Sequence, residues 1–368
     1  MKDVKNRLHT MLVALCVYVL LGFLIFQGKS LEKMGSNLFF PTISLSVYKE
    51  GPRETMISYV KKLFPLYQYV EKKSATVAVE DTVTFEMLLA QEAEDELRVS
   101  EDLTQNTQSS SVTTSKVSLE KLRDFNYLLS NYYTVDSTTM IGPEQLNADQ
   151  LLAKDMKINN NSNGPKVLIF HTHSQEAFKD SKSGDASTSI VGMGAYLAKL
   201  LNQKGIETMH HNGVYDLING KLDRSKAYQM SEEGVQKILN QNPSIEVVID
   251  LHRDGVPETT HLVTNINGKQ TAKIMFFNGL SRTKTNGDIA YLKNPYIQDN
   301  LSFSLQMQLK AQEMYAGYTR KIYLKGYRYS LHMMPKSLLI EAGAQTNTVQ
   351  EIKNAMELLA NILAEVLL

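Results

Sequence analysis

The chain has 368 residues and 39 basic and 39 acidic side chains, so its formal net charge is zero. It has no global positive field to hold phosphate backbones, which argues against nucleic-acid binding. Hydrophobic residues make up 43% of the chain, enough to bury a core, and its length allows about two or three domains. Its single cysteine excludes a disulfide framework and a cysteine-based zinc site, so any metal must bind histidine and carboxylate ligands.

The N-terminal segment is strongly apolar. Residues 8–28 contain no Asp, Glu, Lys or Arg, and about 20 apolar residues in a helix span a hydrocarbon core of about 30 Å. Basic residues precede the run, which by the positive-inside rule favours a cytoplasmic N-terminus. We therefore expect residues 1–34 to form an uncleaved, single-pass anchor in the cell membrane, with an extracytoplasmic catalytic domain. A cleaved signal peptide and a buried core helix are the alternatives.

Two segments separate this expected anchor from the main domain. Residues 35–84 hold short apolar clusters and are expected to form a small juxtamembrane region. Residues 86–102 carry seven acidic side chains opposed only by Arg98, and a run rich in Ser and Thr follows. Such a composition does not offset the entropy of ordering the backbone, so we expect a flexible linker over residues 85–117. An acidic interaction motif is the alternative.

Short apolar strands alternate with amphipathic helices in the rest of the chain. We expect strands over residues 166–171, 206–210, 245–252, 272–278 and 337–341. Helices are expected over residues 190–202, 225–239 and 302–315, and a last helix opens at the capping box formed by Thr348 and Glu351. This alternation predicts an α/β domain over residues 118–368, with a parallel or mostly parallel sheet and helices on both faces.

Three of these strands end in side chains that can bind metal or transfer protons. His171 and His173 follow the first strand, with Glu176 close behind; His252 ends the third strand and Glu341 the last. Open parallel sheets place their ligands outside the carboxyl ends of their strands, so we expect these groups to meet. Hydrolytic zinc takes three His or carboxylate ligands and a water whose pKa falls to about 7, and a separate carboxylate removes the proton.

We therefore interpret His173, Glu176 and His252 as zinc ligands and Glu341 as the general base. Period-two alternation would send His171 and His173 to the same side of the sheet, so either can be the ligand while the other supports it or contacts substrate.

Arg253 follows His252 directly. Its guanidinium either holds a substrate carboxylate or an oxyanion, or forms a structural ion pair with Asp250 or Asp254.

Three motifs in this order resemble the stage II sporulation protein P family: Val167–Phe178, Val248–Asp254 and Leu338–Gly343. The resemblance covers about residues 120–368. The family is similar to zinc-dependent N-acetylmuramoyl-L-alanine amidases. The resemblance implies a membrane-anchored peptidoglycan hydrolase that cleaves the amide between muramic acid and the stem peptide, with a second, endopeptidase activity on cross-links. It implies a role in septal wall degradation and forespore engulfment during sporulation.

The resemblance also implies partners and a site. The partners are the sporulation lytic transglycosylase (sporulation protein D) and the membrane protein called sporulation protein M. His173, Glu176, His252 and Glu341 fill the places of the amidase site residues. One departure is that the wider amidases carry their ligand Glu well beyond the first His. Residues 187–191 contain no acid here, so that role moves to Glu176.

Two other classes of function compete with the hydrolase. A catalytically silent, membrane-anchored module that recruits other cell-wall enzymes is the main alternative, and zinc content would discriminate the two. A metalloprotease is disfavoured because the chain has no H-E-x-x-H helix.

Overall fold

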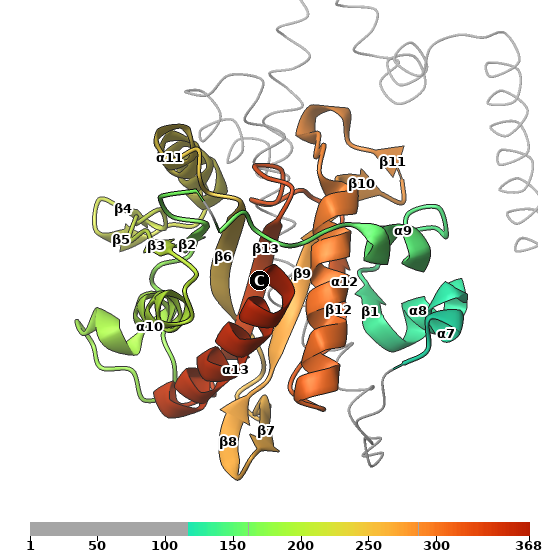
Figure 1. Cartoon of the computed structure of the whole chain (residues 1–368). Coiled ribbons are helices and arrows are strands. Elements are labelled where there is room, and N and C mark those ends of the chain that lie inside the picture. Colours follow the sequence, from blue (N-terminus) through green and yellow to red (C-terminus); the bar gives the residue numbers. More distant parts are fainter. Residues whose placement is uncertain (1–116, 161, 286) are drawn as a thin grey trace, which may run out of the picture. The chain divides into compact units, whose positions relative to one another are not determined.

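The computed structural model describes residues 117–368 except residues 161 and 286 (Figure 1). The expected anchor over residues 1–34 and juxtamembrane region over 35–84 lie outside the described residues, as does the expected linker except for Val117. The extents of these segments therefore stay predictions.

A seven-stranded sheet forms the centre of the part of the chain that the structure describes (Figure 1). In spatial order its strands are β1 (Tyr133–Val135), β12 (Ile322–Lys325), β9 (Ile274–Gly279), β13 (Ser337–Ala344), β6 (Val247–Asp254), β2 (Val167–Phe170) and β3 (Thr208–His210). The first three strands run parallel to one another, as do the last four. The two groups meet antiparallel at the β9–β13 pair. The sheet is therefore mostly parallel, and the expected α/β class is confirmed.

Helices cover both faces of this sheet. Figure 1 shows α10 (Ile190–Gln203), α12 (Ile297–Met314) and α13 (Val349–Leu367) on the near face. Helix α11 (Ala227–Gln241) packs on the other face, where its Val235 joins a buried cluster with side chains of β2. The smaller helices are α7 (Leu119–Arg123), α8 (Phe125–Tyr132), α9 (Ala148–Ala153), η2 (Ala186–Thr188) and η3 (Ala290–Leu292).

Within the described residues, three antiparallel hairpins lie outside the central sheet. They are β4 (Leu217–Ile218) with β5 (Lys221–Leu222), β7 (Val263–Ile266) with β8 (Lys269–Ala272), and β10 (Arg282–Thr283) with β11 (Gly287–Asp288).

Strand β2 shows why the sequence folds this way. Val167 and Ile169 join the core beneath α10 and α13, whereas Leu168 and Phe170 join the core beneath α11. Successive strand side chains point to opposite faces, so a run that is apolar throughout is buried on both sides. The last helix, α13, begins at the capping box predicted from Thr348 and Glu351.

The helices of the structure bear on the predicted location in the cell membrane. Among residues 117–368, with gaps at 161 and 286, no helix is long and apolar enough to cross a membrane. Even α13, with 19 residues, carries Glu351, Lys353, Glu357 and Glu365, and charged groups are costly in hydrocarbon. The prediction of a single-pass protein of the cell membrane is therefore wrong for the chain as the structure describes it.

Candidate metal centre

Three side chains predicted as metal ligands lie together in the structure. One nitrogen each of His173 and His252 and one oxygen of Glu176 lie within 4.8 Å of one another. Nδ1 of His173 is 3.4 Å from Oε1 of Glu176, and Nδ1 of His252 is 3.9 Å from the same oxygen. Zinc bonds of about 2.0–2.1 Å in a tetrahedral site put ligand atoms about 3.3 Å apart. Two imidazoles and one carboxylate at these separations fit a zinc ion with one open position.

The loop that carries His173 and Glu176 is fixed from two directions. Ser174 donates its hydroxyl to Oδ1 of the buried Asp216 at 2.6 Å, and the backbone N–H of Gln175 donates to Oδ2 at 3.0 Å. Oε2 of Glu176 accepts the backbone N–H of Arg253 at 2.8 Å. The other carboxylate oxygen, Oε1, therefore faces the two imidazoles.

Asp250 orients the ring of His252. Nε2 of His252 lies 2.8 Å from Oδ1 of Asp250, so this nitrogen carries a proton, and Nδ1 is the nitrogen that faces Glu176 and can bind a metal once its own proton is released. The buried carboxylate of Asp250 also accepts the N–H of Thr172 at 2.9 Å, the Thr172 hydroxyl at 2.7 Å and the Ser330 hydroxyl at 2.8 Å. A carboxylate behind a metal-binding imidazole orients the ring and raises its basicity.

The charges of the group depend on each other because its members are buried. Burial opposes ionisation of Glu176, but hydrogen bonds from His173 and His252 outweigh it and hold the pKa of Glu176 well below its usual value. Burial opposes protonation of His252, but Asp250 and Glu176 outweigh it and raise the pKa of His252 well above its usual value. Burial lowers the pKa of His173. The centre therefore offers an ionised carboxylate to a cation.

Glu341 lies beside this group on the neighbouring strand. It is in register with His252 in the parallel β6–β13 pair, and with Met275 in the antiparallel β9–β13 pair. Side chains in register on adjacent strands share a face of the sheet. Leu339, two residues before Glu341, packs with Met275 on the α11 face, which is therefore the face of Glu341 as well. Its side chain is buried.

His171 does not share the side of His173, contrary to the expectation from strand alternation. Nδ1 of His171 lies 2.7 Å from the Leu251 carbonyl, and Nε2 lies 2.9 Å from Nε2 of His210, next to Gly194 of α10. The His173 ring instead contacts Tyr228 of α11 and His252, with ring centroids 5.6 and 4.9 Å away. Because β2 ends at Phe170, its alternation does not reach these two histidines.

Arg253 uses its guanidinium to hold backbone carbonyls. Nε donates to the Ala177 carbonyl at 2.9 Å and Nη1 to the Asp254 carbonyl at 3.1 Å. The Asp254 carboxylate pairs instead with Arg320, at 2.6 Å. The Asp254 carboxylate is therefore not the ion-pair partner of Arg253, and the expected contact of Arg253 with a substrate carboxylate or an oxyanion stays a prediction.

Several residues at the centre were not assigned a role from the sequence. Asp250 had a usable signal, because it precedes His252 by two positions on one strand and so shares its face. Ser330, Asp216, Tyr228 and Arg224 carried none, because they reach the centre from loops and from helix α11 rather than from the strands that end there.

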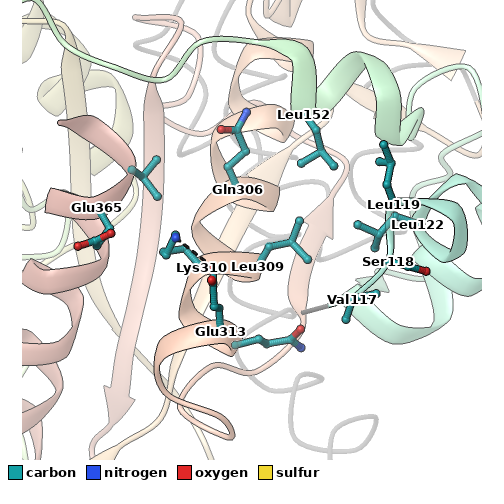
Figure 2. Close-up of a pocket in the computed structure, with 12 residues that line it drawn as sticks. Val117, Ser118, Leu119, Leu122, Leu152, Gln306, Leu309, Lys310, Glu313 and Glu365 are labelled. Carbon is teal, nitrogen blue, oxygen red and sulfur yellow. Dashed lines mark ion pairs between the residues drawn. The ribbon is translucent and has the colours of Figure 1, made fainter. Parts of the chain in front are cut away.

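A groove lies elsewhere on the chain. Figure 2 shows it between α7, α9, α12 and the end of α13. It is mainly apolar and has a volume of about 680 Å³, and Nζ of Lys310 lies 3.0 Å from Oε2 of Glu313 in its lining. Its lining includes no histidine and shares no residue with the metal centre. We therefore place the candidate site at the His173, Glu176 and His252 group rather than in this groove.

Comparison with known proteins identifies the family. Residues 54–364 match the family described as Stage II sporulation protein P (SpoIIP). The chain belongs to this family. It is also 22% identical over 214 residues to Stage II sporulation protein P of Bacillus subtilis (strain 168). The match covers 54% of this chain and 50% of that protein, so the chain spans about half the length of the curated relative it matches.

Solved amidase structures are also similar to this chain. AmiC2 of Nostoc punctiforme, an N-acetylmuramoyl-L-alanine amidase, is 14% identical, with 55% of this chain and 98% of that chain covered and a TM-score of 0.31. The CwlD amidase from Clostridioides difficile, solved in complex with the GerS lipoprotein, is 16% identical, with 53% and 96% covered and a TM-score of 0.32.

Proposed function

We propose that this protein is a zinc-dependent peptidoglycan hydrolase of the N-acetylmuramoyl-L-alanine amidase type. It cleaves the bond between muramic acid and the stem peptide during septal wall degradation and engulfment in sporulation. The observation that carries the proposal is the buried group of His173, Glu176 and His252, with Glu341 in register beside it. Family membership supports the sporulation role.

In this proposal the chain's own residues handle the proton of the reaction. Zinc, when bound by His173, Glu176 and His252, would lower the pKa of a water and polarise the scissile carbonyl. Glu341 accepts the proton of the attacking water and returns it to the departing amide nitrogen. Asp250 keeps the proton on Nε2 of His252, so that Nδ1 stays available as a ligand.

The proposal includes two finer features that the family resemblance implies. One is a second, endopeptidase activity on peptide cross-links at the same centre. The other is association with the lytic transglycosylase and the sporulation protein M, which co-purification with the full chain would test.

Mass spectrometry of muropeptides released from purified wall by the full chain tests the function directly. Amidase action yields stem peptides with a free N-terminal amine and glycan strands that lack them. Chelation should abolish release, and added zinc should restore it. Bound zinc in the untreated protein, measured by elemental analysis, should be close to one equivalent. A zinc-loaded protein that releases nothing would contradict the hydrolase, and a protein that neither binds zinc nor releases anything would favour the silent assembly module.

A further inference from the structure

Arg224 brings a positive charge to the metal centre from outside the sheet. Its Nη2 atom lies 3.5 Å from Oε1 of Glu176, the oxygen that faces both imidazoles. The Arg224 side chain is 32% exposed and that of Glu176 only 4%. The guanidinium is therefore partly exposed to solvent, whereas the carboxylate that it contacts is buried.

The backbone around Arg224 is held firmly. It follows the β4–β5 hairpin, whose turn at Asn219 and Gly220 has φ values of 52° and 75°, the left-handed region suited to these residue types. The N–H of Asp223 donates to the Asp216 carbonyl at 2.9 Å, and the Arg224 carbonyl accepts the N–H of Ala227 at the start of α11. Because the Asp216 carboxylate also fixes the ligand loop, Arg224 and Glu176 share one anchor.

A simple role as counter-ion to Glu176 is a poor explanation of this placement. Glu176 already accepts the Arg253 N–H and lies beside two imidazoles. Once a divalent cation binds Oε1, a guanidinium 3.5 Å from that oxygen repels the cation and weakens its binding. The position is better suited to a negative charge that arises during a reaction.

The strand order places Arg224 and Glu341 on two sides of the metal ligands. Glu341 lies on β13, which neighbours β6 and His252. Arg224 contacts Glu176, which belongs to the loop after β2, on the opposite side of β6. A carbonyl group bound over the centre would therefore have the proton acceptor on one side and the cation on the other.

We infer that Arg224 is a catalytic residue whose guanidinium stabilises the negative charge that develops on the scissile carbonyl oxygen. This inference rests on the proposed amidase function. The water oxygen bonds to the carbonyl carbon, the C=O π electrons move to the oxygen beside Arg224, and Glu341 takes the proton. When the C=O bond re-forms, the C–N bond breaks, and the departing nitrogen takes up the proton from Glu341.

The test compares R224Q and R224K with a control, K221Q, which removes an equal charge from the exposed strand β5 of the same hairpin. Oxyanion donors contribute about 10²–10³-fold to kcat, so R224Q should lower kcat on muropeptide substrate by that amount and leave KM within about threefold. R224K should recover part of the loss, and K221Q should match wild type. Zinc dissociation constants, measured with a chromophoric chelator, should stay unchanged or fall in R224Q.

Each alternative role of Arg224 predicts a different experimental result for the R224Q variant. A wild-type kcat in R224Q would overturn the inference, as would a rise in KM alone or a loss of zinc affinity in R224Q. These last two results would make Arg224 a substrate clamp or a support for the ligand loop. The two kinetic results require an active wild-type protein, whereas zinc affinity can be measured without activity. An inactive, zinc-loaded wild type would instead overturn the proposed function itself.

Discussion

The Nε2–H of His252 donates to Oδ1 of Asp250 over 2.8 Å, and this bond determines which ring nitrogen meets Glu176. Asp250 is itself fixed by Thr172 and Ser330, whose hydroxyls both lie within hydrogen-bonding distance of Oδ2. The orientation of a proposed metal ligand thus depends on residues from three separate segments.

Asp250→Asn should weaken zinc binding by about 10–100-fold, the usual effect of losing a carboxylate behind a metal-binding histidine. An amide can present its N–H₂ group to Nε2, which would move the imidazole proton to Nδ1 and block the ligand position. Zinc competition titrations measure the effect, with Asp288→Asn as a control because Asp288 is 79% exposed. Ser330→Ala should weaken zinc binding by a smaller factor. Wild-type zinc affinity in a folded Asp250→Asn protein would contradict this role.

Glu341→Gln should lower kcat for wall hydrolysis by at least about 10²-fold, because the amide cannot accept the proton of the attacking water. Glu341 is not among the proposed zinc ligands, so bound zinc should stay near one equivalent. Muropeptide release and elemental analysis of the same preparation measure the two quantities. Retained hydrolysis would show that another group acts as the base, and lost zinc would make Glu341 a ligand.

The buried ion pair between Asp136 and Lys325 should matter for stability rather than activity. Lys325 is 1% exposed, and its Nζ lies 3.1 Å from Oδ2 of Asp136. Removing one partner of a buried pair leaves a buried charge and costs about 3–5 kcal/mol, so Asp136→Asn should lower the free energy of unfolding by about 3 kcal/mol.

Urea unfolding checks this value against Asp149→Asn, which breaks the exposed Arg123–Asp149 pair. That control should lower the free energy of unfolding by less than about 1 kcal/mol. Equal losses in the two variants would contradict the burial argument.

His210 should make the folded state sensitive to mild acid. Burial, and secondarily the neighbouring His211, lowers the pKa of His210 from 6.5 to about 4. Between pH 6.5 and 4 the unfolded chain binds a proton at His210 that the folded chain does not bind. The free energy of unfolding therefore decreases as the pH falls through this range.

His210→Gln keeps an N–H group near Nε2 of His171 and removes the titration. When the pH is lowered from 7 to 5, the free energy of unfolding should fall by about 1 kcal/mol more in wild type than in the variant. This value allows for the partial exposure of His210. Urea unfolding in the presence of chelator measures this without a contribution from metal release. Parallel losses in the two proteins would assign the acid sensitivity to other groups.

The features predicted correctly from sequence are those with local signals. The apolar run before His252 indicated β6, and the capping box at Thr348 indicated the start of α13. The general tendency of ligands to gather at strand ends then brought His173, Glu176 and His252 together.

The features that sequence reasoning missed depend on tertiary contacts. Strands β1 and β12 are short, with three and four residues, and each contains a polar side chain, so neither stands out as an apolar run. An apolar run predicts a buried strand but not its direction, so the sequence does not indicate that β9 runs antiparallel to β13. Asp216 and Arg224 contact the ligand loop although they lie about 40 and 50 residues beyond it in the chain. They flank the β4–β5 hairpin, and no periodic pattern in the sequence indicates where this hairpin packs.

At the antiparallel junction of β9 and β13 the strands reverse direction, so the carboxyl ends of the two groups of strands lie at opposite edges of the sheet. Carboxyl termini of β2, β6 and β13 supply the metal centre at one edge, while those of β1 and β12 supply Asp136 and Lys325 at the other. The two sets share no hydrogen-bond partner among the contacts described above. Substitutions in them should combine additively, so an engineer can tune heat tolerance and turnover of this scaffold separately.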